Sequence, residues 1–341
     1  MVRRVALLLL VLLVPVLLFF SCIGVHAHLF WYGWGVLLYG LDGLHVSQES
    51  LGWYHRVGGA LSASCKPGGL LSAITALGAG VCKPGLLAPG AAVRAALGAH
   101  VNVTLLNADP PVWQVDGLFD APEAARMVDI GAVPGRMRAA TAGTVFDDSK
   151  RNNKKMYLQA GWDGEPPVSA EEVAEGAELK RRVAAMAQLP PDHLEDLQIQ
   201  RTLPGEFYHM HHDFDSGELL KPSGPRLWTV LLYCSTVTAG DGGETDFPLL
   251  GLKVRPVLGR AVFWPNVYEH TLVRDLRTMH ASLLLERGEK HAVNLNAYPA
   301  RYEPPDDAWG QAHMRFIEWV SNTHMDHREA RRKATHHPEE L

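Results

Sequence analysis

The chain opens with a pattern typical of membrane insertion. Arg3 and Arg4 precede an uncharged, mostly apolar run over residues 5–25, and an aromatic segment follows it. At about 1.5 Å per residue, the run is long enough to cross a bilayer core of about 30 Å. Residues 1–41 are therefore predicted to be a signal anchor, with a cleaved signal peptide as the alternative. For an anchor, the two arginines favour a type II orientation with the rest of the chain in the lumen.

The pattern loses its regularity in the next segment. Over residues 42–110, Gly-Gly and Pro-Gly pairs interrupt every helical period. We expect a lumenal stem rich in Gly, Ala and Pro in this part of the chain.

Two helix starts are recognisable after the stem. Asp120 and Glu123 have the spacing of a capping box, and so do Ser169 and Glu172. Apolar residues recur with helical spacing after each pair. The pattern predicts one helix that ends near residue 130 and a second that ends near residue 189.

Short strands dominate the remainder. The expected strands are rich in Val, Leu and aromatic residues, and they cover residues 112–118, 197–203, 207–214, 227–234, 260–263, 280–286 and 291–298. Such an order of strands, separated by Gly and Pro turns, predicts a mainly β sandwich or jelly roll. One domain is therefore expected over residues 111–302, and a C-terminal helix with a basic tail over 303–341.

Composition and short motifs restrict the possible cellular compartments and binding partners. With 32 Lys and Arg against 37 Asp and Glu, the net charge of −5 excludes a dedicated nucleic-acid binder. Four cysteines are too few for a disulfide scaffold, although Cys65 and Cys82, in two copies of Cys-Lys-Pro-Gly, could pair or stay free. A glycosylation sequon at Asn102 and a C-terminal Pro-Glu-Glu-Leu, which partly resembles a retrieval signal, predict an endoplasmic reticulum or Golgi glycoprotein.

One stretch carries the candidate chemistry. His211 and Asp213 are two positions apart in an expected strand, so both side chains point to the same face. His280, at the start of another expected strand, is the best third ligand, and Lys290 would bring a cation near the metal across a turn. Two histidines and a carboxylate leave positions open on a metal, as in non-haem Fe(II) oxygenases. A hydrolytic zinc site is the competing interpretation.

Around these residues, the sequence resembles the prolyl 4-hydroxylase family of 2-oxoglutarate- and Fe(II)-dependent dioxygenases, of the membrane-anchored plant and algal type. The resemblance extends over the expected domain, and its motifs occupy residues 115–119, 197–201, 205–208, 211–214, 229–233, 242–248, 254–263, 280–281 and 288–290. It implies a double-stranded β-helix with N-terminal helices packed on one sheet.

The resemblance also implies roles for individual residues. His211, Asp213 and His280 would bind Fe(II), and Lys290 would pair with the distal carboxylate of 2-oxoglutarate, with a hydroxyl hydrogen bond from Thr245. The co-substrates would be O2 and 2-oxoglutarate, with L-ascorbate to re-reduce the iron. The product would be 4-hydroxyproline in a peptide or protein of the secretory pathway, formed with release of succinate and CO2.

The sequence departs from the family pattern at three places. Thr202 stands where a co-substrate-binding Tyr is frequent, so it is expected to contribute a shorter hydroxyl. Asn294 and Asn296 occupy the strand in which an aromatic residue commonly follows the Lys. Residues 144–160, which include Arg151, replace the usual substrate loop. A 2-oxoglutarate oxygenase for another residue or a small molecule, and a non-catalytic peptide-binding module, therefore remain as alternatives.

Overall fold

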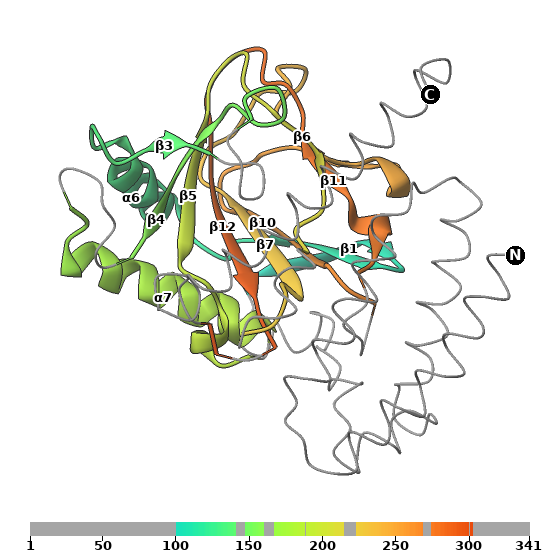
Figure 1. The fold of residues 1–341 in the computed structure, drawn as a ribbon, viewed down its shortest axis with the longest axis horizontal. Helices are drawn as coiled ribbons and strands as arrows, with labels where there is room; N and C mark the ends of the chain where they lie inside the picture. Colours follow the sequence, from blue (N-terminus) through green and yellow to red (C-terminus); the bar gives the residue numbers. More distant parts are fainter. Residues whose placement is uncertain are drawn as a thin grey trace, which may run out of the picture.

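The computed structural model describes residues 100–140, 147–159, 167–187, 189–214, 223–268, 274–299 and 301–302. The fold is built on two antiparallel sheets that face each other (Figure 1). The larger has the order β1-β2-β10-β7-β12-β5-β4-β3 and the smaller β6-β11-β8-β9. The large-sheet strands are β1 (Asn102–Ala108), β2 (Pro111–Asp116), β3 (Arg138–Ala139), β4 (Lys154–Leu158), β5 (Leu197–Thr202), β7 (Trp228–Tyr233), β10 (Arg260–Pro265) and β12 (Lys290–Ala297). The small-sheet strands are β6 (Tyr208–His211), β8 (Thr245–Phe247), β9 (Leu252–Val254) and β11 (His280–Ser282).

The order of the strands defines the fold. From β5 to β12 the chain moves back and forth between the sheets, so that β5, β7, β10 and β12 lie in one and β6, β8, β9 and β11 in the other. In the order β10-β7-β12-β5 of the large sheet and β6-β11-β8 of the small one, neighbours are not consecutive in sequence, which is the connectivity of a jelly roll. The predicted double-stranded β-helix is confirmed.

Two helices cover one face of the large sheet (Figure 1). Helix α6 (Ala121–Ala132) begins at the predicted capping box, in which Asp120 and Glu123 each accept a hydrogen bond from the other's backbone. Helix α7 (Ala170–Ala187) begins in the same way at Ser169 and Glu172. Such caps satisfy amide groups that have no partner inside the helix.

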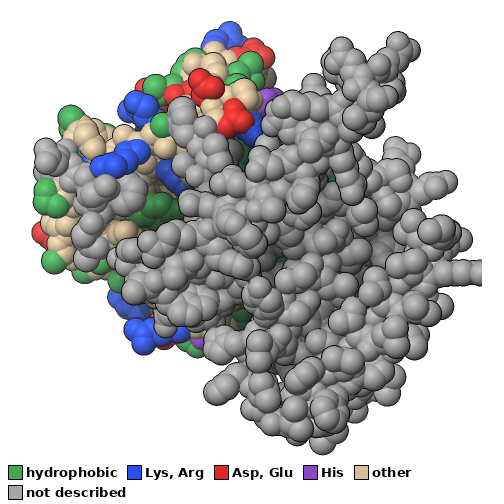
Figure 2. All heavy atoms as spheres, in the orientation of Figure 1, with side chains coloured by type: hydrophobic (Ala, Val, Ile, Leu, Met, Phe, Trp, Pro, Cys, Tyr) green, Lys and Arg blue, Asp and Glu red, His purple; other side chains and the backbone are tan. Residues whose placement is uncertain are grey.

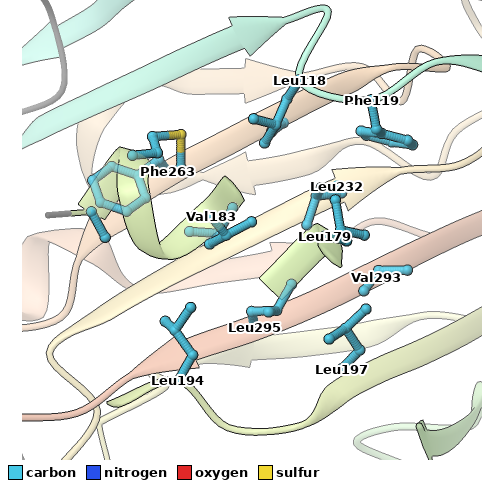
Figure 3. Packing of buried hydrophobic residues seen from close by; sticks show 14 of the residues in the cluster. Leu118, Phe119, Leu179, Val183, Leu194, Leu197, Leu232, Phe263, Val293 and Leu295 are labelled. Atoms are coloured by element: carbon cyan, nitrogen blue, oxygen red, sulfur yellow. The ribbon is translucent and has the colours of Figure 1, made fainter. Parts of the chain in front are cut away.

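The main core lies between these helices and the sheet (Figure 3). Ile130 of α6 and Val183 of α7 are fully buried there with alternate residues of the strands, such as Val293 and Leu295 of β12. Because successive residues of a strand point to opposite faces, Lys290, Asn294 and Asn296 of the same strand face the small sheet. The space between the two sheets therefore receives the polar side chains.

A smaller apolar cluster closes one part of the space between the sheets. It joins residues of both sheets, among them Tyr233, Phe247 and Trp264. On the described surface visible in Figure 2, side chains of both charge signs are interspersed.

Several expectations differ from the structure. The stem was expected to reach residue 110, but Asn102–Ala108 forms β1, which pairs along its length with β2. The strand expected at 207–214 ends at His211, and the one expected at 280–286 ends at Ser282. Strands β3, β4, β8 and β9 were not predicted, because three or fewer residues or a mixed polar pattern give no clear period of two.

Other expectations lie outside the described residues. These are the apolar run at 5–25, the Cys65 and Cys82 pair, and the C-terminal helix and tail. Neither described helix has the length and hydrophobicity needed to cross a bilayer.

Candidate metal centre and co-substrate site

Three of the predicted residues converge between the sheets. His280 of β11 is the register partner of His211 of β6, and Asp213 lies in the turn that follows β6. The Nε2 atom of His211 is 3.5 Å from Oδ1 of Asp213, and Nε2 of His280 is 3.6 Å from its Oδ2. One ligand atom of each residue lies within 4.8 Å of the others. Two imidazole nitrogens and a carboxylate oxygen in this arrangement match a facial Fe(II) site.

Backbone carbonyls orient both imidazoles. Nδ1 of His211 is 2.8 Å from the carbonyl oxygen of His209, and Nδ1 of His280 is 3.0 Å from that of Thr278. A carbonyl only accepts, so each Nδ1 must carry a proton, and in the neutral ring the lone pair is then on the Nε2 that faces Asp213. This is the tautomer that a metal ligand requires, and such outer contacts fix the ring orientation.

The charges of the site suit a divalent cation. Burial, together with repulsion from His211, lowers the pKa of His280 to about 4. Burial raises the pKa of Asp213, but the opposing effects of His280, His211 and Thr229 are larger together, and the net pKa lies below its usual range. At neutral pH the donor set is therefore a neutral His280 and an ionised carboxylate, the forms that bind metal.

The neighbouring histidines have other surroundings. His212 uses both ring nitrogens inside the protein, with Nε2 2.8 Å from the carbonyl of Asp275 and Nδ1 accepting from the amide of Phe214. The side chain of His209 is exposed. The bonds of His212 end β6 and turn the chain, so Asp213 reaches the site from a turn and not from a strand.

A stack of side chains supports His211. The ring of Tyr208 lies 3.5 Å from that of His211, nearly parallel to it, and the guanidinium of Arg151 lies 4.2 Å from the Tyr208 ring on a bridge between the two chain segments. Arg151, from the segment expected to be a substrate loop, therefore lies in the wall of the site.

Lys290 is the first residue of β12 in the large sheet, and its side chain is buried between the two sheets. Its Nζ donates to the carbonyl of Gly243 at 2.8 Å and to Oγ of Ser282 at 2.9 Å. Ser282 follows His280 by two positions in β11, which separates them by roughly 7 Å along one face. Burial lowers the pKa of Lys290 to about 7. A buried ammonium at this distance from the metal ligands is placed to receive an anionic group.

Thr245 is the register partner of Ser282, to which Lys290 donates, and it bonds to a residue that the sequence did not single out. The buried hydroxyl of Tyr233 donates to Oγ1 of Thr245 at 2.7 Å, and Nζ of Lys290 is 5.7 Å from the centre of the Tyr233 ring. The signal was available in the alternation of β7, since Thr229, Leu231 and Tyr233 share the interior face.

Thr202 faces the same interior. It is the register partner of Lys290 and is buried, but its Oγ1 accepts a hydrogen bond from Nδ2 of Asn153 at 3.4 Å. Among the described residues, the Thr202 hydroxyl therefore contacts Asn153 and not Lys290.

Comparisons with known proteins identify the class. Residues 197–298 match the family model of the 2OG-Fe(II) oxygenase superfamily, and they contain β5 to β12 with the three candidate metal ligands and Lys290. This part of the chain thus resembles a 2OG-Fe(II) oxygenase domain, and that family implies Fe(II), 2-oxoglutarate and O2 as the metal and co-substrates.

Within this class the chain is similar to prolyl 4-hydroxylases, which confirms the predicted resemblance. It is 36% identical over 156 residues to a putative prolyl 4-hydroxylase of Acanthamoeba polyphaga mimivirus, covering 44% of this chain and 59% of the relative. It is 32% identical over 127 residues to prolyl 4-hydroxylase 1 of Arabidopsis thaliana, covering 33% and 44%. The chain thus spans about half the length of these curated relatives.

One solved structure is also similar to part of the chain. The viral collagen prolyl hydroxylase of Paramecium bursaria Chlorella virus-1, in complex with 2OG, is 25% identical with a TM-score of 0.41. The match covers 55% of this chain and 95% of that one.

Proposed function

We propose that the chain is an Fe(II)- and 2-oxoglutarate-dependent dioxygenase that hydroxylates peptidyl proline to 4-hydroxyproline, with release of succinate and CO2. The observation that carries the proposal is the convergence of His211, Asp213 and His280 within 4.8 Å, together with the buried amine of Lys290 on the facing sheet. Similarity to curated prolyl 4-hydroxylases supports the choice of substrate.

Each residue has a distinct task in this proposal. His211, Asp213 and His280 hold Fe(II), which supplies the activation of O2 when it is bound. Lys290 binds the distal carboxylate of 2-oxoglutarate, Thr245 and Tyr233 add hydroxyl groups beside it, and the other end of the co-substrate then faces the three ligands. L-ascorbate would keep the iron reduced, a requirement proposed from the family resemblance.

The residues around the site keep their geometry fixed. Carbonyl groups hold the two imidazoles, and the apolar cluster with Trp264 and Phe247 lies against His280, with ring centres 4.8 and 5.5 Å away. Such packing excludes water from that side of the site and keeps Nε2 of His280 directed inward. A non-catalytic module would not need both imidazoles in the ligand tautomer.

A peptide panel tests the proposal. The full chain, purified with Fe(II), ascorbate and 2-oxoglutarate, is expected to form succinate in step with the addition of one oxygen atom to proline, measured by mass spectrometry. The panel contains poly-proline, hydroxyproline-rich glycoprotein-type and collagen-like peptides, with matched peptides that carry alanine in place of proline. Succinate formation that no proline peptide stimulates would refute prolyl hydroxylation and favour an oxygenase for another residue or a small molecule.

We also propose that the enzyme is a type II membrane glycoprotein with its catalytic domain in the lumen of the endoplasmic reticulum or Golgi. The apolar run at residues 5–25 behind Arg3 and Arg4 supports this location. Asn102 and Thr104 of the sequon are exposed at the start of β1, so the asparagine is accessible to a glycosyl transferase.

Glycosidase treatment checks the location. The expressed chain is expected to gain electrophoretic mobility after removal of N-glycans, and Asn102→Gln is expected to abolish that shift. In sealed microsomes the domain should resist added protease until detergent is present. A chain that is cleaved without detergent and whose mobility no glycosidase changes would contradict the lumenal placement.

A further inference from the structure

A closed ring of hydrogen bonds begins and ends at Asp213. Its Oδ2 accepts the hydroxyl of Thr229 at 2.7 Å, and the same hydroxyl lies 2.9 Å from Oδ1 of Asn296. The amide nitrogen of Asn296 donates to Glu195. Glu195 pairs with Nη2 of Arg226 at 3.4 Å, and Nη1 of Arg226 returns to the backbone carbonyl of Asp213 at 3.5 Å.

The central members of the ring are deeply buried. Thr229 is 1% exposed, Asn296 2% and Glu195 1%. Thr229 and Asn296 are register partners on β7 and β12, and the amide of Glu195 also donates to the carbonyl of Asn296 at 3.0 Å. Buried polar groups that are all satisfied define one arrangement of their surroundings, whereas a missing member leaves the others without partners.

The direction of each bond is determined by its neighbours. Glu195 only accepts, so Nδ2 of Asn296 must face it and Oδ1 must face Thr229. Nδ2 of Asn266 donates to Oγ1 of Thr229 at 2.9 Å, so the single hydroxyl proton lies on the side of Asp213 and Asn296, whose two oxygens share it. Asn296 therefore limits the rotation of the hydroxyl that contacts the metal-binding carboxylate.

We propose that Asn296 is a positioning residue for the metal centre, which acts through Thr229 on the carboxylate of Asp213. Asn296 lies on the strand where the sequence departs from the family pattern, and none of the roles in the proposed function uses it. The inference rests on the metal site of that proposed function but concerns the binding of the metal and not the choice of substrate.

Metal affinity tests this inference without any turnover. The full chain is titrated with Co(II), and the dissociation constant and the ligand-field absorption bands are measured. Thr229→Val is expected to weaken Co(II) binding by roughly 10- to 100-fold, the usual cost of losing an outer contact to a metal ligand, and Asn296→Leu by about tenfold. Thr229→Ser, which keeps the hydroxyl, should restore most of the affinity.

A double-mutant cycle tests whether Asn296 affects Co(II) binding through Thr229 or independently of it. The double variant Thr229→Val with Asn296→Leu should bind Co(II) no more weakly than Thr229→Val alone, because the path is already broken. Val183→Ala, in the core against the helices, controls for lost stability and should leave the affinity and the spectrum unchanged. Asn296→Ala gives the same readout if the leucine variant does not fold.

Three outcomes would overturn the inference. These are an unchanged Co(II) affinity and spectrum in the Asn296 variants, full additivity in the double variant, and an equal loss of affinity in Val183→Ala. A wild-type chain that binds Co(II) but hydroxylates no peptide would refute the proposed function and leave this inference standing. A wild-type chain that does not bind Co(II) would refute both.

Discussion

The His280→Ala variant is expected to lose Fe(II) binding and, with it, 2-oxoglutarate turnover. His280 supplies one of three ligand atoms that lie within 4.8 Å of one another, and alanine has no donor to replace it. Loss of an outer contact alone costs roughly 10- to 100-fold, so loss of a ligand should lower metal affinity and activity by more than about 100-fold. Co(II) titration and succinate formation measure the two effects separately.

A second histidine provides the matched control. His291 lies on β12 next to Lys290, but its side chain points to the other face and pairs with Glu289. His291→Ala should keep metal affinity and turnover near the wild-type values. Full activity in His280→Ala would show that the metal centre has been assigned to the wrong residues.

The second large effect is expected at Lys290. Lys290→Ala should raise the KM for 2-oxoglutarate by roughly 10- to 100-fold, because a charge-assisted hydrogen bond in a buried site contributes about 1.5–3 kcal/mol. Turnover at saturating co-substrate should change less, since the metal ligands are untouched. Lys253→Ala, at an exposed position of β9, is the control that should leave the KM unchanged. An unchanged KM in Lys290→Ala would contradict the assigned role.

The pKa of Lys290 adds a pH dependence with a definite sign. Burial lowers this pKa to about 7, so the amine loses its proton as the pH rises above 7 in the co-substrate-free protein. A carboxylate requires the ammonium, and binding above pH 7 must therefore take up a proton. The dissociation constant for 2-oxoglutarate should rise about tenfold for each pH unit above 7.

The arginine variant separates this effect from other titrations. Arg keeps its charge at every accessible pH, so Lys290→Arg should have a flat affinity profile above pH 7, whatever its absolute affinity. Calorimetric titration of 2-oxoglutarate between pH 6 and about 9 measures both profiles. The same slope in both proteins would show that another group is responsible.

Local patterns were enough to predict much of the fold. The capping boxes at Asp120 and Ser169 begin α6 and α7 because their side chains and backbones bond to each other within one turn. The longer strands β5, β7, β10 and β12 were predicted because one of their faces packs in an apolar core. Short strands such as β8 and β9 were missed because three residues are held by their sheet partners and not by their own pattern.

The candidate site also has a part that the sequence predicts and a part that only the structure shows. The spacing of His211 and Asp213 and the family motifs identified the ligands and Lys290 from the sequence alone. The partners of these residues were not visible there, because they come from segments far apart in the chain. Asn296 meets Thr229 through the register of β7 and β12, and Tyr233 meets Thr245 only because the two sheets pack against each other.

The sequence by itself determined the resemblance to an oxygenase domain, the three candidate metal ligands and the candidate cation for the co-substrate, because the identity and order of these residues carry the chemistry. Only the tertiary structure decided that Asp213 enters from a turn, that backbone carbonyls select the tautomers of His211 and His280, and that the ligand carboxylate belongs to a buried ring of hydrogen bonds. The carbonyl contacts of the two histidines join residues two positions apart, but they require the backbone and ring orientations that folding imposes. The ring of hydrogen bonds joins residues that are remote in sequence, such as Thr229 and Asn296, and their distances are fixed only when the strands assemble.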